Sequence, residues 1–134
     1  MSDKITIQRT FNTHFFEFID HILSMNLDKV NTELMTAKNS FELIRKANPT
    51  LIIKVWFKFI YMKYSPSIDA GDITFFFKKD YSNDVKNLPN AADIIKIIDS
   101  LREPIFQMST ENQALSMKYI QNLSKLSTIY KNFG

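Results

Sequence analysis

The sequence predicts an all-α fold, in which a single domain of about five to six helices surrounds one central apolar helix at residues 49–64. Apolar residues recur every three or four positions in most segments, which is the period of an amphipathic helix. One segment is apolar around nearly its whole circumference, as expected of a helix in the middle of a bundle. A chain of 134 residues with 45% hydrophobic content fits one domain with its own core.

Two amphipathic helices are expected before the central one. Residues 1–10 are predicted to form a loose N-terminal arm, and the first helix follows at residues 12–25. The second helix begins near Val30 and ends near Ala47, because the residue before Pro49 disfavours helical geometry. Both helices turn phenylalanine, isoleucine and leucine side chains toward one face.

The central helix is expected to start at Asn48, which is a favoured N-cap. Pro49 suits the first turn, where its missing N–H costs nothing. Apolar side chains cover most of the following turns, and one narrow stripe is left to reach water. That stripe consists of Lys54, Lys58 and Tyr61.

The next part of the chain is less regular. Gly71 is a natural helix stop, and Asp72 is a natural cap for the segment after it. Residues 73–81 form either a short buried helix or a strand, and the helix is favoured because no second strand candidate exists to pair with them. After a polar loop, a helix is predicted to start at Asn90 and to break or kink at Pro104.

The last helix is expected at about residues 110–130, with Ser109 or Thr110 as its cap. Polar side chains line its other face, so it is predicted to lie across the surface, where it can dock on a partner. The predicted apolar face consists of Leu115, Tyr119, Leu123, Leu126, Tyr130 and Phe133.

Composition argues against several classes of function. The chain has no cysteine, which excludes disulfides, cysteine-ligated metals and a cysteine nucleophile. Its two glycines are too few for a phosphate loop or a dinucleotide fingerprint. No signal peptide is recognisable, and the longest apolar run is too short to span a membrane. We therefore expect a non-enzymatic protein that is not secreted and has no cofactor, no small-molecule substrate and no catalytic residues.

Two groups of ionisable residues come closest to a reactive site. His14, Glu17 and His21 share one face of the first helix and, with a further ligand, would suit zinc or non-haem iron. Their spacing matches no metal motif, so a solvated polar face is favoured and no metal site is predicted. Four aspartates lack calcium-loop spacing and are interpreted as caps and turn residues. They are Asp69, Asp72, Asp80 and Asp84.

Aromatic residues are more numerous than a small bundle needs, with 12 Phe and five Tyr. Core packing is favoured for any single one, but some are expected to be exposed and to bind a protein partner. The predicted interface residues are Tyr119, Tyr130, Phe133, Phe75 and Phe77. The alternative is nucleic-acid binding through lysines interleaved with an aromatic ring. That surface would comprise Arg45, Lys46, Lys54, Lys58 and Tyr61.

Three stretches of the chain stand out together: TAKNSFELIRKANPTLIIKVWFKFI, DAGDITFFFKKDYSNDV and SMKYIQNLSKLSTIY. They resemble a family of small uncharacterised proteins encoded by large nucleocytoplasmic DNA viruses of the mimivirus and phycodnavirus kind. The family has no assigned activity. The resemblance implies a place in the virion or the host cytoplasm, either as a minor structural component or in viral gene expression. The implied partners are other viral structural proteins, a second copy of the chain, or nucleic acid.

Overall fold

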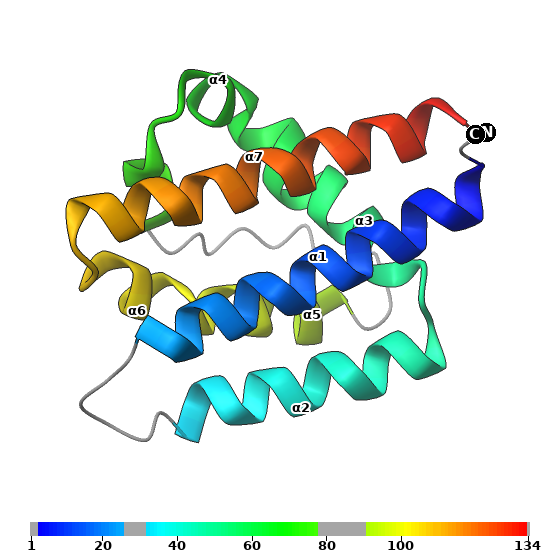
Figure 1. Cartoon of the computed structure of the whole chain (residues 1–134). Helices are drawn as coiled ribbons and strands as arrows, with labels where there is room; N and C mark the ends of the chain where they lie inside the picture. Colours follow the sequence, from blue (N-terminus) through cyan, green and yellow to red (C-terminus); the bar gives the residue numbers. More distant parts are fainter. Residues whose placement is uncertain (1–2, 26–31, 78–90, 134) are drawn as a thin grey trace.

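The computed structural model describes residues 3–25, 32–77 and 91–133, and these residues form an all-α bundle without strands (Figure 1). The predicted single-domain helical fold is therefore confirmed. The elements in chain order are α1 (Lys4–Met25), α2 (Thr32–Ala47), α3 (Leu51–Val55), the π-helix η1 (Trp56–Tyr61), α4 (Met62–Ala70), the 3-10 helix η2 (Ile73–Phe77), α5 (Ala91–Ser100), α6 (Arg102–Phe106) and α7 (Thr110–Asn132).

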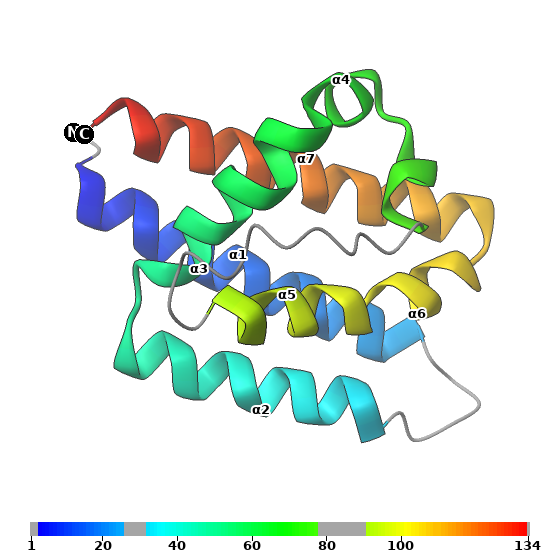
Figure 2. The same ribbon diagram turned by 180° about the vertical axis from the view of Figure 1, so that it is seen from behind.

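Helices α1 and α7 lie side by side and antiparallel, so that the start of α1 and the end of α7 meet at one end of the molecule (Figure 1). Helix α2 packs along the other side of α1, and the view from behind shows α5 next to α2, with α6 continuing from α5 toward α7 (Figure 2). Helix α3 contacts α1, α2, α5 and α7, and η1 and α4 continue against α7. The apolar segment thus runs through the middle of the bundle.

Trp56 is the centre of the core. Its side chain is fully buried, and the rings of Phe11 and Phe15 from α1 meet it edge to face at centroid distances of 6.3 and 5.9 Å. Phe15 also stacks on Phe41 of α2 at 5.0 Å. The indole N–H of Trp56 donates a hydrogen bond of 3.0 Å to Ser124 Oγ of α7. The single tryptophan therefore ties the central segment to α1 and α7.

The first helix is longer than predicted. It begins at Lys4, so the prediction of a loose arm over residues 1–10 is wrong from that residue onward. Asp3 caps the helix, because its Oδ1 accepts a hydrogen bond of 2.7 Å from the Thr6 N–H. This hydrogen bond lowers the pKa of the Asp3 carboxyl. Ile7 is buried, and the first turns of α1 consequently pack onto the bundle.

The central segment differs from the predicted helix at both ends. It begins at Leu51, and Asn48 does not cap it, because the Asn48 side chain accepts a hydrogen bond of 3.1 Å from the Thr50 hydroxyl instead. It continues through α4 beyond the predicted end at Tyr64, where the backbone bends (φ −122°, ψ 18°). Pro66 lies inside α4, and its missing N–H and crowding of the preceding turn explain a bend at this point.

A π-helix, η1, interrupts the α-helical geometry of this segment. Each π-type hydrogen bond encloses one more residue than an α-type bond, so the side chains beyond it are turned relative to the α-helical prediction. Met62, an apolar residue of the predicted central helix, is 63% exposed just beyond η1. Lys54 and Lys58 are exposed as predicted, and Tyr61 is half-buried.

The helix stop at Gly71 is confirmed. Gly71 adopts a left-handed φ of 76° after α4. The N–H groups of Gly71 and Asp72 donate to carbonyls of α4 over 3.1 and 2.9 Å, which is the Schellman pattern. Asp72 then caps η2 by accepting hydrogen bonds from the N–H and the hydroxyl of Thr74. The favoured helix is confirmed for residues 73–77, and the rest of that run lies outside the described residues.

Helix α5 ends before the predicted break. The interruption falls at Leu101, whereas Pro104 lies in the first turn of α6, where proline is tolerated. The predicted start at Asn90 lies outside the described residues. Nearby, the buried Arg102 side chain donates hydrogen bonds of 2.8 Å to Asp99 Oδ1 and of 2.6 Å to the Phe76 carbonyl. This arginine holds η2 against α5 and α6.

The buried face of helix α7 is shifted from the predicted one, because Leu123 and Tyr130 of that face are buried and its two end residues are exposed. Ser109 caps it by accepting a hydrogen bond of 3.2 Å from the Asn112 N–H. Leu115 and Phe133 of the predicted apolar face are 46% and 49% exposed. Serines are buried in their place, each donating its hydroxyl proton to a carbonyl three or four residues earlier, which satisfies the hydroxyl inside the core. They are Ser116, Ser124 and Ser127.

Candidate functional site

Most of the predicted protein interface is packed against the core. Tyr130 and Phe75 are 8% and 9% exposed, and Tyr119 is half-buried. The side chain of Phe77 lies outside the described part of the structure. Phe133 is 49% exposed. Among the predicted residues whose side chains are described, Phe133 therefore offers the largest accessible apolar surface.

Helix α1 begins and α7 ends at the same end of the bundle (Figure 1), and the terminal turns of both helices carry exposed apolar side chains. Ile5 is 58% exposed, Ile129 is 37% exposed, and Phe133 lies one helical turn beyond Ile129. The first turn of α1 is fixed against the last turns of α7, because Lys4 Nζ lies 4.8 Å from the ring centroid of Tyr130. We call Ile5, Ile129 and Phe133 the apolar end.

Tyr119 lies across three rings of α1. Its ring centroid is 4.8 Å from that of His14, 5.4 Å from that of Phe18 and 5.2 Å from that of His21. The interpretation of His14 and His21 as members of a solvated face is therefore wrong, because both are half-buried against α7. Glu17 is exposed, and its Oε1 lies 3.3 Å from His14 Nδ1.

The electrostatics of this cluster favour a neutral His21. Burial lowers the pKa of His21, and its Nε2 lies 3.4 Å from Ser116 Oγ. Within residues 3–25, 32–77 and 91–133 there is no group of three His, Cys, Asp or Glu residues placed to hold a metal ion. The geometry is that of an aromatic packing contact between α1 and α7.

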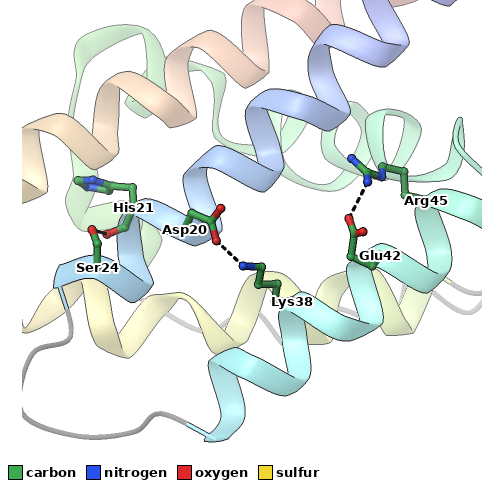
Figure 3. Close-up of polar contacts among 6 residues, drawn as sticks. All are labelled: Asp20, His21, Ser24, Lys38, Glu42 and Arg45. Atoms are coloured by element: carbon green, nitrogen blue, oxygen red, sulfur yellow. Dashed lines mark hydrogen bonds and ion pairs between the residues drawn. The ribbon is translucent and has the colours of Figure 1, made fainter.

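Two ion pairs occupy the side of the bundle formed by α1 and α2 (Figure 3). Lys38 Nζ lies 2.7 Å from Asp20 Oδ1 and joins the two helices. Arg45 Nη2 lies 2.8 Å from Glu42 Oε1, and the guanidinium lies over the ring of Phe16 of α1, 5.6 Å from its centroid. Arg45 of the predicted nucleic-acid surface is therefore engaged in holding α2 against α1.

The other predicted nucleic-acid residues fall on three elements. Lys46 is exposed near the end of α2, whereas Lys54, Lys58 and Tyr61 lie on α3 and η1. The ring of Tyr61 is 6.1 Å from that of Phe57, which is also half-buried. We call Lys54, Phe57, Lys58 and Tyr61 the basic stripe.

A pocket of about 340 Å³ opens between α4 and α7, beside the end of η1. Its volume lies at the lower end of the range typical of ligand sites, about 300–1,000 Å³. The pocket adjoins the two irregular parts of the central segment, which are η1 and the bend at Tyr64. It is lined by Tyr61, Ile68, Asp69, Gln121, Ser124, Lys125, Thr128 and Ile129.

Several polar groups of this α4/α7 pocket already have protein partners. Gln121 Nε2 donates to a carbonyl of α4 over 2.9 Å, and the Thr128 hydroxyl donates to the Ser124 carbonyl over 3.0 Å. Asp69 and Lys125 differ, because both are exposed and neither makes an ion pair with any described residue. One negative and one positive charge, on different walls of the pocket, thus remain for a ligand.

The sequence alone predicted only part of the α4/α7 pocket and of the apolar end. Tyr61 belonged to a predicted site, but Lys125 is distant in the chain and showed only as one residue of a polar helix face. Ile5 fell within the predicted arm, so the sequence did not indicate that it is exposed near the end of α7.

Comparison of the chain with models of protein families, with curated proteins and with solved structures gives no match. None of the described helices has the length and apolar character needed to cross a membrane. Function is therefore argued from the residues and their arrangement.

Proposed function

We propose that the chain is a non-enzymatic helical structural or adaptor protein, associated with virus particles, which acts by binding other proteins of the particle or a second copy of itself. The observation that carries this proposal is the apolar end, Ile5, Ile129 and Phe133. Large apolar side chains that are exposed at the paired ends of two helices are candidates for a protein interaction surface. The viral setting is supported by the resemblance of three stretches of the sequence to a family of large DNA viruses.

The apolar end has the composition of a small interface. Ile129 and Phe133 are four residues apart and so lie on the same side of α7. Two exposed lysines, Lys4 and Lys131, lie in the terminal turns of α1 and α7 at this end of the bundle. An apolar centre with a polar rim is the usual anatomy of a protein contact, in which aromatic residues contribute most of the binding energy. Phe133 is therefore the residue on which binding should depend most.

The test is to replace Ile129→Ser and Phe133→Ser together and to measure the copy number of the protein in purified virus particles by quantitative mass spectrometry. The matched control is Leu43→Ser, which removes another exposed apolar side chain, 70% accessible, on a different helix, α2. We expect the double variant to fold and to be lost from particles, while the control is retained. Equal retention of both variants, or absence of the unmodified protein from particles, would contradict the proposal.

A second candidate function is that of a nucleic-acid-binding accessory factor of viral replication or transcription. It is favoured by the basic stripe, whose exposed lysines lie beside two half-buried rings. Such binding weakens steeply as salt rises, because phosphate contacts release counterions. Failure to bind any nucleic acid at low salt would remove this candidate.

A further inference from the structure

We infer that the α4/α7 pocket, together with the neighbouring basic stripe, binds a nucleotide of a single-stranded nucleic acid. The inference rests on the second proposed function and names the site and the ligand class for it. Its starting point is that Tyr61 belongs to both features: it is part of the stripe and it lines the pocket.

The stripe has the two kinds of group that single strands require. Such strands are bound by aromatic rings that stack on bases, next to cations that contact phosphates. Tyr61 and Phe57 provide two rings with centroids 6.1 Å apart. Lys54 and Lys58 are exposed and make no ion pair with any residue that the structure describes. These lysines are therefore ready to contact phosphates.

The pocket adds a cation from another part of the chain. Lys125 of α7 contributes to the wall opposite α4. A single strand passing Tyr61 would therefore meet positive charge on both sides. The pocket volume of about 340 Å³ suits one unpaired nucleotide rather than a base pair. The π-helix gives further support, because π-helical turns are rare and frequently occur at functional sites.

Asp69 gives the site an orientation. Its carboxylate repels phosphates but accepts hydrogen bonds from the amino group of a base. With Lys125 on one wall and Asp69 on the other, the phosphate is directed toward α7 and the base edge toward α4. Cytosine presents an amino group where thymine presents a carbonyl oxygen, so an oligocytidine strand should bind more tightly than an oligothymidine strand.

The protein contains its own reporter for this pocket. The indole N–H of Trp56 donates to Ser124 Oγ, and Ser124 lines the pocket. Trp56 is the single tryptophan of the chain, so its fluorescence reports this position alone. A nucleotide in the pocket should change the Trp56 emission, and binding elsewhere on the surface should leave it unchanged.

The experiment is fluorescence anisotropy of labelled oligocytidine and oligothymidine DNA, of oligocytidine and oligouridine RNA, and of a DNA duplex, with the full chain at about 50 mM salt. Tyr61→Leu should weaken binding roughly 5- to 100-fold through the lost stacking, whereas Tyr61→Phe keeps the ring and the affinity. Lys125→Gln should weaken binding and reduce the salt slope by about 0.7. The matched control is Lys118→Gln, because Lys118 is exposed on the same helix but does not line the pocket. Asp69→Asn should reduce the preference for cytosine.

Each outcome bears on the inference. The inference is supported if Lys125→Gln weakens binding while Lys118→Gln does not, and if binding changes the Trp56 emission. Equal effects of Lys125→Gln and Lys118→Gln, or duplex binding as tight as single-strand binding, would overturn the pocket and leave the nucleic-acid function standing. Absence of binding to every strand would overturn both. If Tyr61→Leu does not fold, the lysine pair decides the question, because both lysines are exposed.

Discussion

The hydrogen bond between Trp56 and Ser124 gives the sharpest prediction for stability. The two side chains are 0% and 1% exposed, and Trp56 Nε1 lies 3.0 Å from Ser124 Oγ. Replacing Ser124→Ala would leave the indole N–H without a partner inside the core. A buried donor that loses its acceptor costs about 1–3 kcal/mol. We therefore expect Ser124→Ala to lower the free energy of unfolding by about 1–3 kcal/mol.

Ser127 provides the matched control on the same helix. It is also fully buried, but its hydroxyl donates only to the Ser124 carbonyl, over 2.7 Å. That carbonyl stays in the helix, and alanine is a better helix former than serine, so Ser127→Ala should be neutral or slightly stabilising. The measurement is urea unfolding followed by circular dichroism. Combining Ser124→Ala with Trp56→Phe should add little beyond Trp56→Phe alone. Equal destabilisation by the two serine variants would refute the reasoning.

Three further predictions concern stability. Gly71→Ala should lower the free energy of unfolding by about 1–2 kcal/mol, because Gly71 has a left-handed φ of 76°. Gly71→Asn should lower it less, because asparagine tolerates that region. Thermal unfolding of both variants measures the difference. Burial lowers the pKa of His21, so the unfolded chain takes up this proton first as pH falls below about 6.5. The free energy of unfolding should therefore decrease as the pH is lowered through that range, and it should decrease less for His21→Gln. Urea midpoints measured at neutral and mildly acid pH would show the difference. Arg102→Lys should cost about 1.5–3 kcal/mol, because it removes charged hydrogen bonds to Asp99 and to the Phe76 carbonyl, and an unchanged urea midpoint would contradict this.

Features set by neighbouring residues were predictable from the sequence. The helical spacing of apolar residues identified α2, α5, α7, most of α1 and the central segment up to Tyr64, because a surface helix must bury one face. The stop at Gly71, the cap at Asp72 and the cap at Ser109 depend on hydrogen bonds to residues only a few positions away. Such local features can be predicted without knowledge of the tertiary fold.

The π-helix was not predictable in the same way. Whether a segment adopts α-type or π-type hydrogen bonds depends on how its side chains fit the surrounding core, and the apolar run is compatible with both. Trp56 opens η1 and is fixed by Phe11, Phe15 and Ser124, which come from two distant helices. An α-helical period carried through η1 therefore gives the wrong direction to side chains beyond it, such as the exposed Met62.

The faces of α7 and the functional surfaces needed the structure for another reason. Serine is usually predicted to be exposed. Ser124 and Ser127 can nevertheless be buried, because each hydroxyl donates a hydrogen bond to a carbonyl of its own helix. The pocket depends on Tyr61 and Lys125, which lie far apart in the chain. The apolar end likewise depends on the antiparallel pairing of α1 and α7 (Figure 1).

The most direct test of protein binding by the apolar end is site-specific photo-crosslinking in the cells in which the chain is made. Phe133→benzoylphenylalanine places the probe in the apolar end, and Thr36→benzoylphenylalanine places it at an exposed polar position on α2. Mass spectrometry then identifies the captured residues. We predict one defined partner from position 133, either a particle protein or a second copy of this chain, and no defined partner from position 36. The same products from both positions, or none from position 133, would contradict the proposal that the apolar end binds a protein.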